Sequence, residues 1–344
     1  MAIDLLGLQP HQVSRDLRGY SVFFYGDPKT GKTTTASHFP ESLLLAFEKG
    51  YNAIPGIMAQ PINKWSEFRQ TLKQLKDEKV KEKFSTIIID TADIAYDYCI
   101  RYICDNAKRS DGGFGVDAIS DIPFGKGYGL VSQEFDECLR SIVQMDYGLV
   151  LISHATDKVF TDEQGKEYNK IVPTLDKRAT NIVSRMTDII GYSRVIKMED
   201  GTQSTKLFIR GTDRFMAGSR FKYTPDYIDF SYQNLVDAIA EAIDKQSKED
   251  GTEFFTSERS NLYLNDNKEL DFDELMEDFN NIVNGLIAKY EETGKFQEYY
   301  QPRIVQITEK YLGRGQKVSQ CSREQVEALS LIVDDLQELV KGEK

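Results

Sequence analysis

Glycines, a lysine and hydroxyl residues near the amino terminus have the types and spacing that bind phosphate groups. The run from Gly26 to Thr33 (GDPKTGKT) fits G-x-x-x-x-G-K-[ST], the Walker A pattern. Glycines let backbone N–H groups turn inward around phosphates, and the amino end of the following helix adds positive charge. Lys32 would reach the β- and γ-phosphates, and Thr33 would hold Mg²⁺. The pattern predicts a site for ATP and Mg²⁺ lined by Gly26, Asp27, Pro28, Lys29, Thr30, Gly31, Lys32, Thr33 and Thr34.

A carboxylate ends a second apolar run and completes this chemistry. Thr86–Asp90 (TIIID) is typical of a buried strand, and Asp90 stands where a Walker B aspartate grips Mg²⁺ through water. The alternative is that Asp90 caps the helix that follows. We interpret Asp93 as that cap or as a surface acid.

The position of a further carboxylate resembles RecA-core ATPases. Glu48 ends the apolar run LLLAF, where RecA-type enzymes carry a glutamate that polarises the attacking water. In AAA+ proteins the base directly follows the Walker B aspartate, but here Thr91 follows Asp90. The chain also lacks the LSGGQ stretch of ABC ATPases. The resemblance implies that Glu48 is the catalytic base, with Glu41 and Asp93 as substitutes; a solvated acid at a strand end is the other interpretation.

The same resemblance implies roles for three more residues. His154 ends the apolar run LIS beside the Walker B strand, where RecA-like proteins place a polar γ-phosphate sensor; it could instead be structural. Arg214 and Arg220 follow the last strand pair, where RecA-like rings and filaments place fingers that reach the neighbouring subunit's ATP. A finger would stabilise charge on the transferring phosphoryl group, whereas the alternative is an ordinary surface arginine.

A narrower resemblance is to phage-encoded RecA-core ATPases, including the Sak-type single-strand annealing proteins. It rests on DLRGYSVFFYGDPKTGKTT, on Glu48, on FGKGYG at 124–129 and on the LISH strand end, and it covers about residues 18–225. The resemblance implies ATP hydrolysis at subunit interfaces of a ring or filament, stimulated by nucleic acid. It also implies binding of single-stranded DNA during recombination or annealing.

Two segments would contact that DNA, because RecA-like proteins use one loop before and one loop after the fourth strand. They correspond here to 108–129 and 156–178. Cations for phosphates and aromatic rings for bases suit sequence-tolerant binding of single strands. The first segment offers Lys108, Arg109, Lys126, Phe114, Phe124 and Tyr128, and the second offers Lys158, Lys166, Lys170, Lys177 and Arg178. Asp111, Asp117, Asp121, Asp162 and Glu163 dilute this charge, so ordinary surface loops are the alternative.

The elements that must position these residues follow an α/β pattern. Short apolar runs alternate with helical patterns between 20 and 245, which predicts a RecA-like P-loop NTPase core with a mainly parallel sheet. Residues 1–19 form an N-terminal segment, 246–270 a linker, and 271–344 an acidic helical domain with three amphipathic stripes. Strands are expected at 20–25, 42–47, 86–90, 148–153, 189–197 and 205–210, helices at 65–76, 92–106, 131–143 and 232–245, and a hairpin or mobile loop at 157–173.

Composition narrows the class of protein and locates the acidity. The 344 residues are 40% hydrophobic and 28% charged, as in an ordinary globular chain, with neither a membrane-spanning run nor a signal peptide. Four cysteines without a C-x-x-C pair favour the cytoplasm, that of the host if the protein is phage-encoded. Residues 1–225 carry 30 basic and 29 acidic side chains, whereas 226–344 carry 13 and 26. The acidic part is a candidate partner-binding segment and a candidate brake on DNA binding.

The sequence is also compatible with two other functions. A helicase-loader type of P-loop protein would act on a protein target and have no intrinsic affinity for DNA. A nucleotide-switched module would bind a partner protein through 271–344 with negligible hydrolysis. A nucleotide kinase is disfavoured, because the chain shows no arginine-rich lid.

Overall fold

The computed structural model describes residues 10–109, 112–251, 255–259 and 270–341. Contacts divide the chain into two compact units, whose described parts are 10–259 and 270–341. Within these ranges, no helix is long and apolar enough to cross a membrane. All four cysteines carry free thiols.

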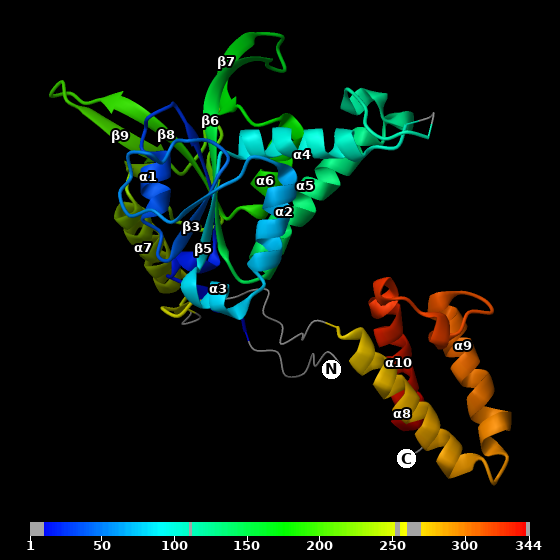
Figure 1. Ribbon diagram of the computed structural model, residues 1–344. Coiled ribbons are helices and arrows are strands. Elements are labelled where there is room, and N and C mark those ends of the chain that lie inside the picture. The colour runs from blue at the N-terminus through cyan, green and yellow to red at the C-terminus, as the bar shows by residue number, and fades with distance from the viewer. Residues whose placement is uncertain (1–9, 110–111, 252–254, 260–269, 342–344) are drawn as a thin grey trace. The chain divides into compact units, whose positions relative to one another are not determined.

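The first unit is built on one large, mainly parallel sheet (Figure 1). Its strands lie in the order β11-β9-β8-β2-β6-β5-β3-β4. Strands β8, β2, β6, β5, β3 and β4 are parallel, whereas β9 and β11 are antiparallel additions at one edge. The strands are β2 (Ser21–Gly26), β3 (Ser42–Ala46), β4 (Ala59–Pro61), β5 (Thr86–Asp90), β6 (Gly148–Thr161), β7 (Glu167–Pro173), β8 (Ile189–Lys197), β9 (Gln203–Phe208), β10 (Gly218–Ser219) and β11 (Tyr227–Asp229).

Helices cover both faces of this sheet, as the continuous apolar runs of its strands require. Alternate residues of each strand enter opposite cores: Phe23 and Ile87 face one side, whereas Phe24 and Ile88 face the other. The first core packs against α2 (Trp65–Gln74), α4 (Ala92–Asn106), α5 (Gly127–Gln144) and α6 (Lys177–Met186), and the second against α1 (Lys32–Ser37) and α7 (Tyr232–Asp250). A short helix, α3 (Glu78–Lys83), precedes β5. The predicted α/β P-loop NTPase fold with a mainly parallel sheet is confirmed.

Several predicted boundaries differ from the structure, most clearly at the end of the first unit. Helix α7 continues to Asp250, five residues beyond the expected end, and Gly251 closes it with a left-handed φ of 63°. Strand β12 (Phe255–Thr256) then pairs with β1 (Val13–Ser14), so part of the predicted linker and part of the N-terminal segment belong to the first unit. Residues 1–9, 252–254 and 260–269 of those predicted segments lie outside the described residues.

The second unit contains three helices with a core of their own. They are α8 (Phe272–Tyr290), α9 (Gln301–Leu312), which a short π-helical turn at Phe296–Tyr300 precedes, and α10 (Val326–Lys341). A capping box precedes the last helix, since the side chain of Gln325 accepts the backbone N–H of Ser322. Leu329, Ile332 and Leu336 are fully buried, and the stripes of α8 and α9 pack against them. The three apolar stripes are therefore satisfied mainly by one another.

Candidate nucleotide and nucleic-acid sites

The Walker A run forms a tight loop between β2 and α1. Gly31 has a φ of 85° at the N-cap of α1, a left-handed conformation that suits glycine. Gly26 approaches β8 so closely that a Cβ built on it would clash with the Ser193 carbonyl oxygen. The hydroxyl of Thr30 also forms a hydrogen bond with Ser193, with 2.7 Å between Thr30 Oγ1 and Ser193 Oγ. The sequence pattern gave no sign of Ser193, which fixes the loop against the neighbouring strand.

Lys32 lies inside this loop. Its Nζ donates to the carbonyl oxygens of Gly26 at 2.9 Å and of Asp27 at 2.7 Å, and the residue is 5% exposed. Burial lowers the pKa of Lys32 to about 8, against the attraction of the nearby carboxylates. A phosphate group would supply the negative charge that favours the protonated amine.

Thr33 and Asp90 come together although 57 residues separate them. Thr33 Oγ1 donates to Asp90 Oδ2 at 2.7 Å, and Asp90 Oδ1 is buried with no hydrogen-bond partner among the described residues. Burial raises the pKa of Asp90 to about 6. A buried carboxylate oxygen without a partner, beside a hydroxyl, fits the donor set that Mg²⁺ prefers.

The register of the sheet explains why Glu48 faces His154. Ala46, Asp90 and Ile152 stand at one level on the adjacent strands β3, β5 and β6. Glu48 and His154 each lie two residues further along, past the point where β5 ends. Their side chains therefore meet above Asp90, with His154 Nε2 3.7 Å from Glu48 Oε1.

Glu48 and His154 each stabilise the charged form of the other. The facing imidazole lowers the pKa of Glu48, while burial opposes the shift. The facing carboxylate raises the pKa of His154, against burial and the nearby Lys32 ammonium. Glu48 is thus kept ionised, as a general base must be, and His154 is protonated over a wider pH range than a free imidazole.

Gly50 shows how closely the acidic and hydroxyl groups converge. A Cβ built on it would lie 3.5 Å from Glu48 Oε1, 3.6 Å from Asp90 Oδ2 and 3.8 Å from Thr33 Oγ1. Three oxygen atoms from three separate elements therefore surround one small space beside the P-loop. Glycine leaves that space open for a metal ion and its water molecules.

The two arginines lie elsewhere. Arg220 pairs with Asp188 at 3.4 Å, and Asp188 accepts the backbone N–H of Ser21 at the amino end of β2, opposite the P-loop. Arg214 is exposed and lies over the ring of Tyr168 in the β6–β7 hairpin, at 6.0 Å. Neither contacts the nucleotide site of its own subunit, so any role in hydrolysis requires a neighbouring subunit.

Asp93 is neither a helix cap nor a surface acid, which corrects the sequence interpretation. Thr91 is the N-cap residue of α4, and Asp93 is half-buried behind it. Asp93 Oδ1 accepts the hydroxyls of Ser153 at 3.1 Å and Thr174 at 2.5 Å. These bonds join α4 to the base of the β6–β7 hairpin, and the sequence contained no pattern that links the three residues.

The two predicted DNA-binding segments are more regular than loops. The first contains short 3₁₀ turns at Ile119–Asp121 and Pro123–Gly125 and the start of α5, and Asp111 lies outside the described residues. The second is the β6–β7 hairpin followed by the first turn of α6. The hairpin expected at 157–173 is confirmed; it projects beyond the sheet in Figure 1.

Comparison with known proteins identifies the family. A model of the AAA domain family matches residues 18–221, more than half of the chain. The chain belongs to the AAA domain family. In this AAA-domain protein, the carboxylate that faces the P-loop belongs to Glu48, just after β3. The residue that follows Asp90 is Thr91, which has no carboxylate.

Two individual proteins resemble this AAA-domain chain. The SPbeta prophage-derived uncharacterized protein YorG of Bacillus subtilis (strain 168) is 34% identical over 348 residues, which cover 99% of each chain. The similarity therefore includes the three-helix unit. The crystal structure of flagellar accessory protein FlaH from Methanocaldococcus jannaschii aligns with 62% of this chain and 85% of its own, at 8% identity and a TM-score of 0.33. That degree of structural similarity is too low to support a functional inference.

Proposed function

We propose that this protein is a RecA-like ATPase that assembles into a ring or filament and acts on single-stranded DNA in phage recombination or annealing. The observation that carries the enzymatic part is the convergence of Lys32, Thr33, Asp90 and Glu48 at the P-loop. The DNA-binding part rests on the chemistry of the β6–β7 hairpin. The similarity of the whole chain to a prophage-derived protein supports a role in phage biology.

Each group at the P-loop has a distinct task in hydrolysis. Lys32 would bind the β- and γ-phosphates of ATP. Thr33 and Asp90 would hold Mg²⁺, which would supply positive charge to stabilise the phosphates during transfer. Glu48, ionised and facing the same space, orients a water molecule and accepts its proton. His154 restrains the Glu48 carboxylate through their ion pair.

One face of the β6–β7 hairpin alternates cations and aromatic rings. Lys158 pairs across the strands with Lys170, and Phe160 pairs with Tyr168, with ring centroids 6.0 Å apart. Cross-strand partners share a face of a hairpin, so these four side chains lie together. Arg214 adds a third cation over Tyr168. Phosphates on the cations and bases against the rings are the contacts that single-strand binding needs.

The acidic side chains of the hairpin lie away from this face, so they do not reduce its positive charge. Asp157 and Glu167 alternate with the residues above and therefore point to the opposite side. Asp162 and Glu163 belong to the turn. Directly opposed lysines repel each other in a free hairpin, and a bound phosphate chain would relieve that repulsion. Binding of an anionic partner to this face would therefore be favourable.

The decisive experiment measures ATP hydrolysis and nucleic-acid binding together. ATPase rates are compared without nucleic acid and with single-stranded DNA, single-stranded RNA or duplex DNA. We expect single-stranded DNA to stimulate hydrolysis most. No binding of any nucleic acid, with hydrolysis stimulated by a protein target, would instead identify the loader-type function.

A pair of matched double variants locates the DNA contact. Lys158→Gln with Lys170→Gln should weaken binding and reduce the slope of log affinity against log salt by roughly 1.4, since each phosphate contact contributes about 0.7. The control is Arg194→Gln with Lys197→Gln, which removes two exposed cations from the other hairpin, β8–β9. Equal salt slopes for the two double variants would remove the β6–β7 hairpin from the DNA site.

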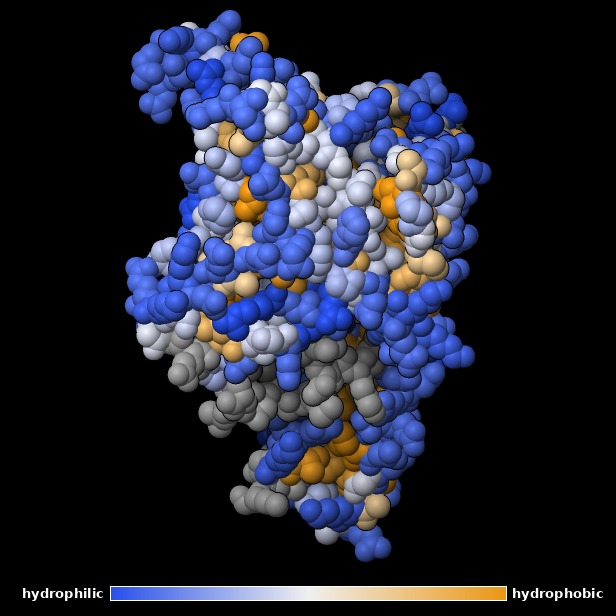
Figure 2. All heavy atoms as spheres, turned by 90° about the vertical axis from the view of Figure 1, so that its left-hand side faces the viewer, coloured by the Kyte–Doolittle hydropathy of each residue, from blue (hydrophilic) through white to orange (hydrophobic). Residues whose placement is uncertain are grey.

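A protein-binding role of the three-helix unit is a second candidate function, and one observation favours it. On the three-helix unit, Val305 of α9 and Leu331 and Val340 of α10 are large apolar side chains that lie exposed on the surface. Figure 2 shows apolar atoms exposed on this unit, between hydrophilic margins. A partner that covers these exposed side chains would stabilise the unit, and proteins captured by residues 270–344 but not by the variant Leu331→Glu would identify it.

A further inference from the structure

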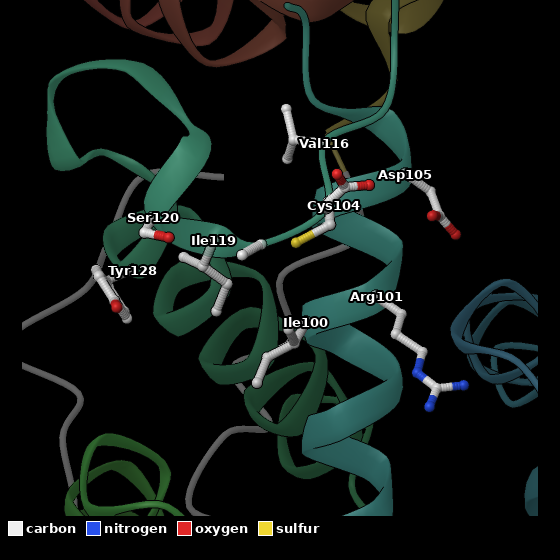
Figure 3. Close-up of a pocket in the computed structure, with 10 residues that line it drawn as sticks. Ile100, Arg101, Cys104, Asp105, Val116, Ile119, Ser120 and Tyr128 are labelled. Atoms are coloured by element: carbon white, nitrogen blue, oxygen red, sulfur yellow. The ribbon is translucent and has the colours of Figure 1, made fainter.

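A cavity lies between the carboxyl-terminal half of α4 and the segment that leads into α5. It has a volume of about 410 Å³ and is formed by ten residues: Ile100, Arg101, Cys104, Asp105, Val116, Asp117, Ala118, Ile119, Ser120 and Tyr128. Figure 3 shows Ile100, Cys104 and Ile119 pointing into the cavity, so apolar side chains form part of its lining. A cavity of this size is at the lower end of the range that encloses a small organic ligand.

Polar and charged residues also belong to the lining of the cavity. Ser120 and Tyr128 stand across the cavity from α4, whereas the side chains of Arg101 and Asp105 project from the other side of that helix (Figure 3). Burial raises the pKa of the Cys104 thiol, so this side chain stays uncharged at neutral pH. The lining thus combines apolar side chains with the hydroxyls of Ser120 and Tyr128 and with the carboxylates of Asp105 and Asp117.

Tyr128 also joins the cavity to the second candidate DNA segment. The guanidinium of Arg178, at the start of α6, lies 4.2 Å from the centre of the Tyr128 ring. A phosphate that pairs with Arg178 would therefore stand beside the Tyr128 ring. Nearby, Phe124 is 94% exposed with a left-handed φ of 62°, and Lys126 lies 5.8 Å from its ring.

We propose that this cavity takes one unstacked base of a bound single strand. The base would enter between the apolar side chains of the lining and the Tyr128 ring, and a flanking phosphate would pair with Arg178. Flipped bases are held in this way elsewhere, by stacking against aromatic and apolar side chains and by polar groups at the base edge. The inference rests on the proposed action on single-stranded DNA and assigns a base-binding site within it.

The test combines two strands with matched protein variants. The strands have the same length and charge: one carries its bases, and the other is abasic throughout. Ala118→Phe places a ring at the wall of the cavity, whereas Leu130→Phe adds the same ring to the exposed surface of α5. Tyr128→Leu removes the stacking ring, and Tyr128→Phe retains it without the hydroxyl.

We expect Ala118→Phe and Tyr128→Leu to weaken binding of the intact strand at least fivefold, and binding of the abasic strand less than twofold. The lower limit corresponds to about 1 kcal/mol for one stacked base. Leu130→Phe should bind both strands like the wild type, and Tyr128→Phe, which keeps the ring, should retain the preference for the intact strand. Equal weakening of both strands would indicate a structural role for the cavity and overturn the proposal, as would unchanged binding of the intact strand.

The design also separates this inference from the proposed function. If the wild type binds neither strand at any salt concentration, the proposed action on DNA is wrong and the base site with it. If the wild type binds both strands with a normal salt dependence but equal affinity, DNA binding stands and the base site is refuted. Binding of free deoxynucleoside monophosphates that Ala118→Phe abolishes, without any effect on strands, would also overturn it.

Discussion

Replacing Asp90 with asparagine should stabilise the nucleotide-free protein while it removes Mg²⁺-dependent activity. Asp90 is 1% exposed, and burial raises its pKa from the usual 3.8 to about 6. At neutral pH the folded chain must therefore keep a carboxylate ionised in a poorly solvated place. Asparagine has nearly the same shape, still accepts the Thr33 hydroxyl, and carries no charge to desolvate.

The magnitude follows from the difference between folded and unfolded pKa values. A shift of about two units corresponds to roughly 3 kcal/mol of lost stability once the pH exceeds the folded value. The native state binds the extra proton between pH 3.8 and about 6, so stability falls as the pH rises through this window. We expect Asp90→Asn to raise the free energy of unfolding by roughly 1–3 kcal/mol at pH 8, and by about half as much at pH 5.

The chain supplies its own reporter for this measurement. Trp65 is the single tryptophan, is buried in α2, and belongs to the first unit, so its fluorescence follows unfolding of that unit in denaturant. Asp16→Asn is the control of opposite sign, because the contacts with Arg18 outweigh burial and lower the pKa of Asp16. That variant should lose stability at pH 8. An Asp90→Asn protein that is less stable than the wild type at pH 8, or a gain that does not shrink at pH 5, would refute the reasoning.

Three further predictions concern the nucleotide site. Lys32→Ala should abolish ATP binding in a calorimetric titration, since the phosphates lose the main cation inside the loop; near-normal affinity would disprove the P-loop assignment. Glu48→Gln should keep ATP bound but slow turnover on the order of 10²-fold or more, the scale of losing a positioned base, and a turnover like the wild type's would exclude Glu48 as the base. Arg214→Ala and Arg220→Ala should each leave binding intact and reduce hydrolysis, with activity partly restored by mixing with Lys32→Ala subunits; two fully active single variants would exclude both arginines.

Local signals were sufficient to predict the strands and helices that carry the nucleotide site. The Walker A run, the apolar strand that ends at Asp90 and the helix over 92–106 are contiguous patterns, and contiguous patterns report local conformation well. The hairpin at 157–173 was predicted by its turn residues, although its first strand proved to be the continuation of β6. Edge and short strands such as β4, β10 and β12 were missed, because their pairing depends on distant partners.

The sequence by itself determined which residues could bind phosphate and metal, because that chemistry depends on residue type and short spacing. Only the tertiary structure decided how those residues combine. Sheet register brought Glu48 to His154 above Asp90, and long-range packing placed Ser193 against Gly26 and joined Asp93 to Thr174. Burial in the folded protein also set the pKa values of Lys32 and Asp90. Register, burial and packing arise from contacts between segments far apart in the chain, so no local pattern records them.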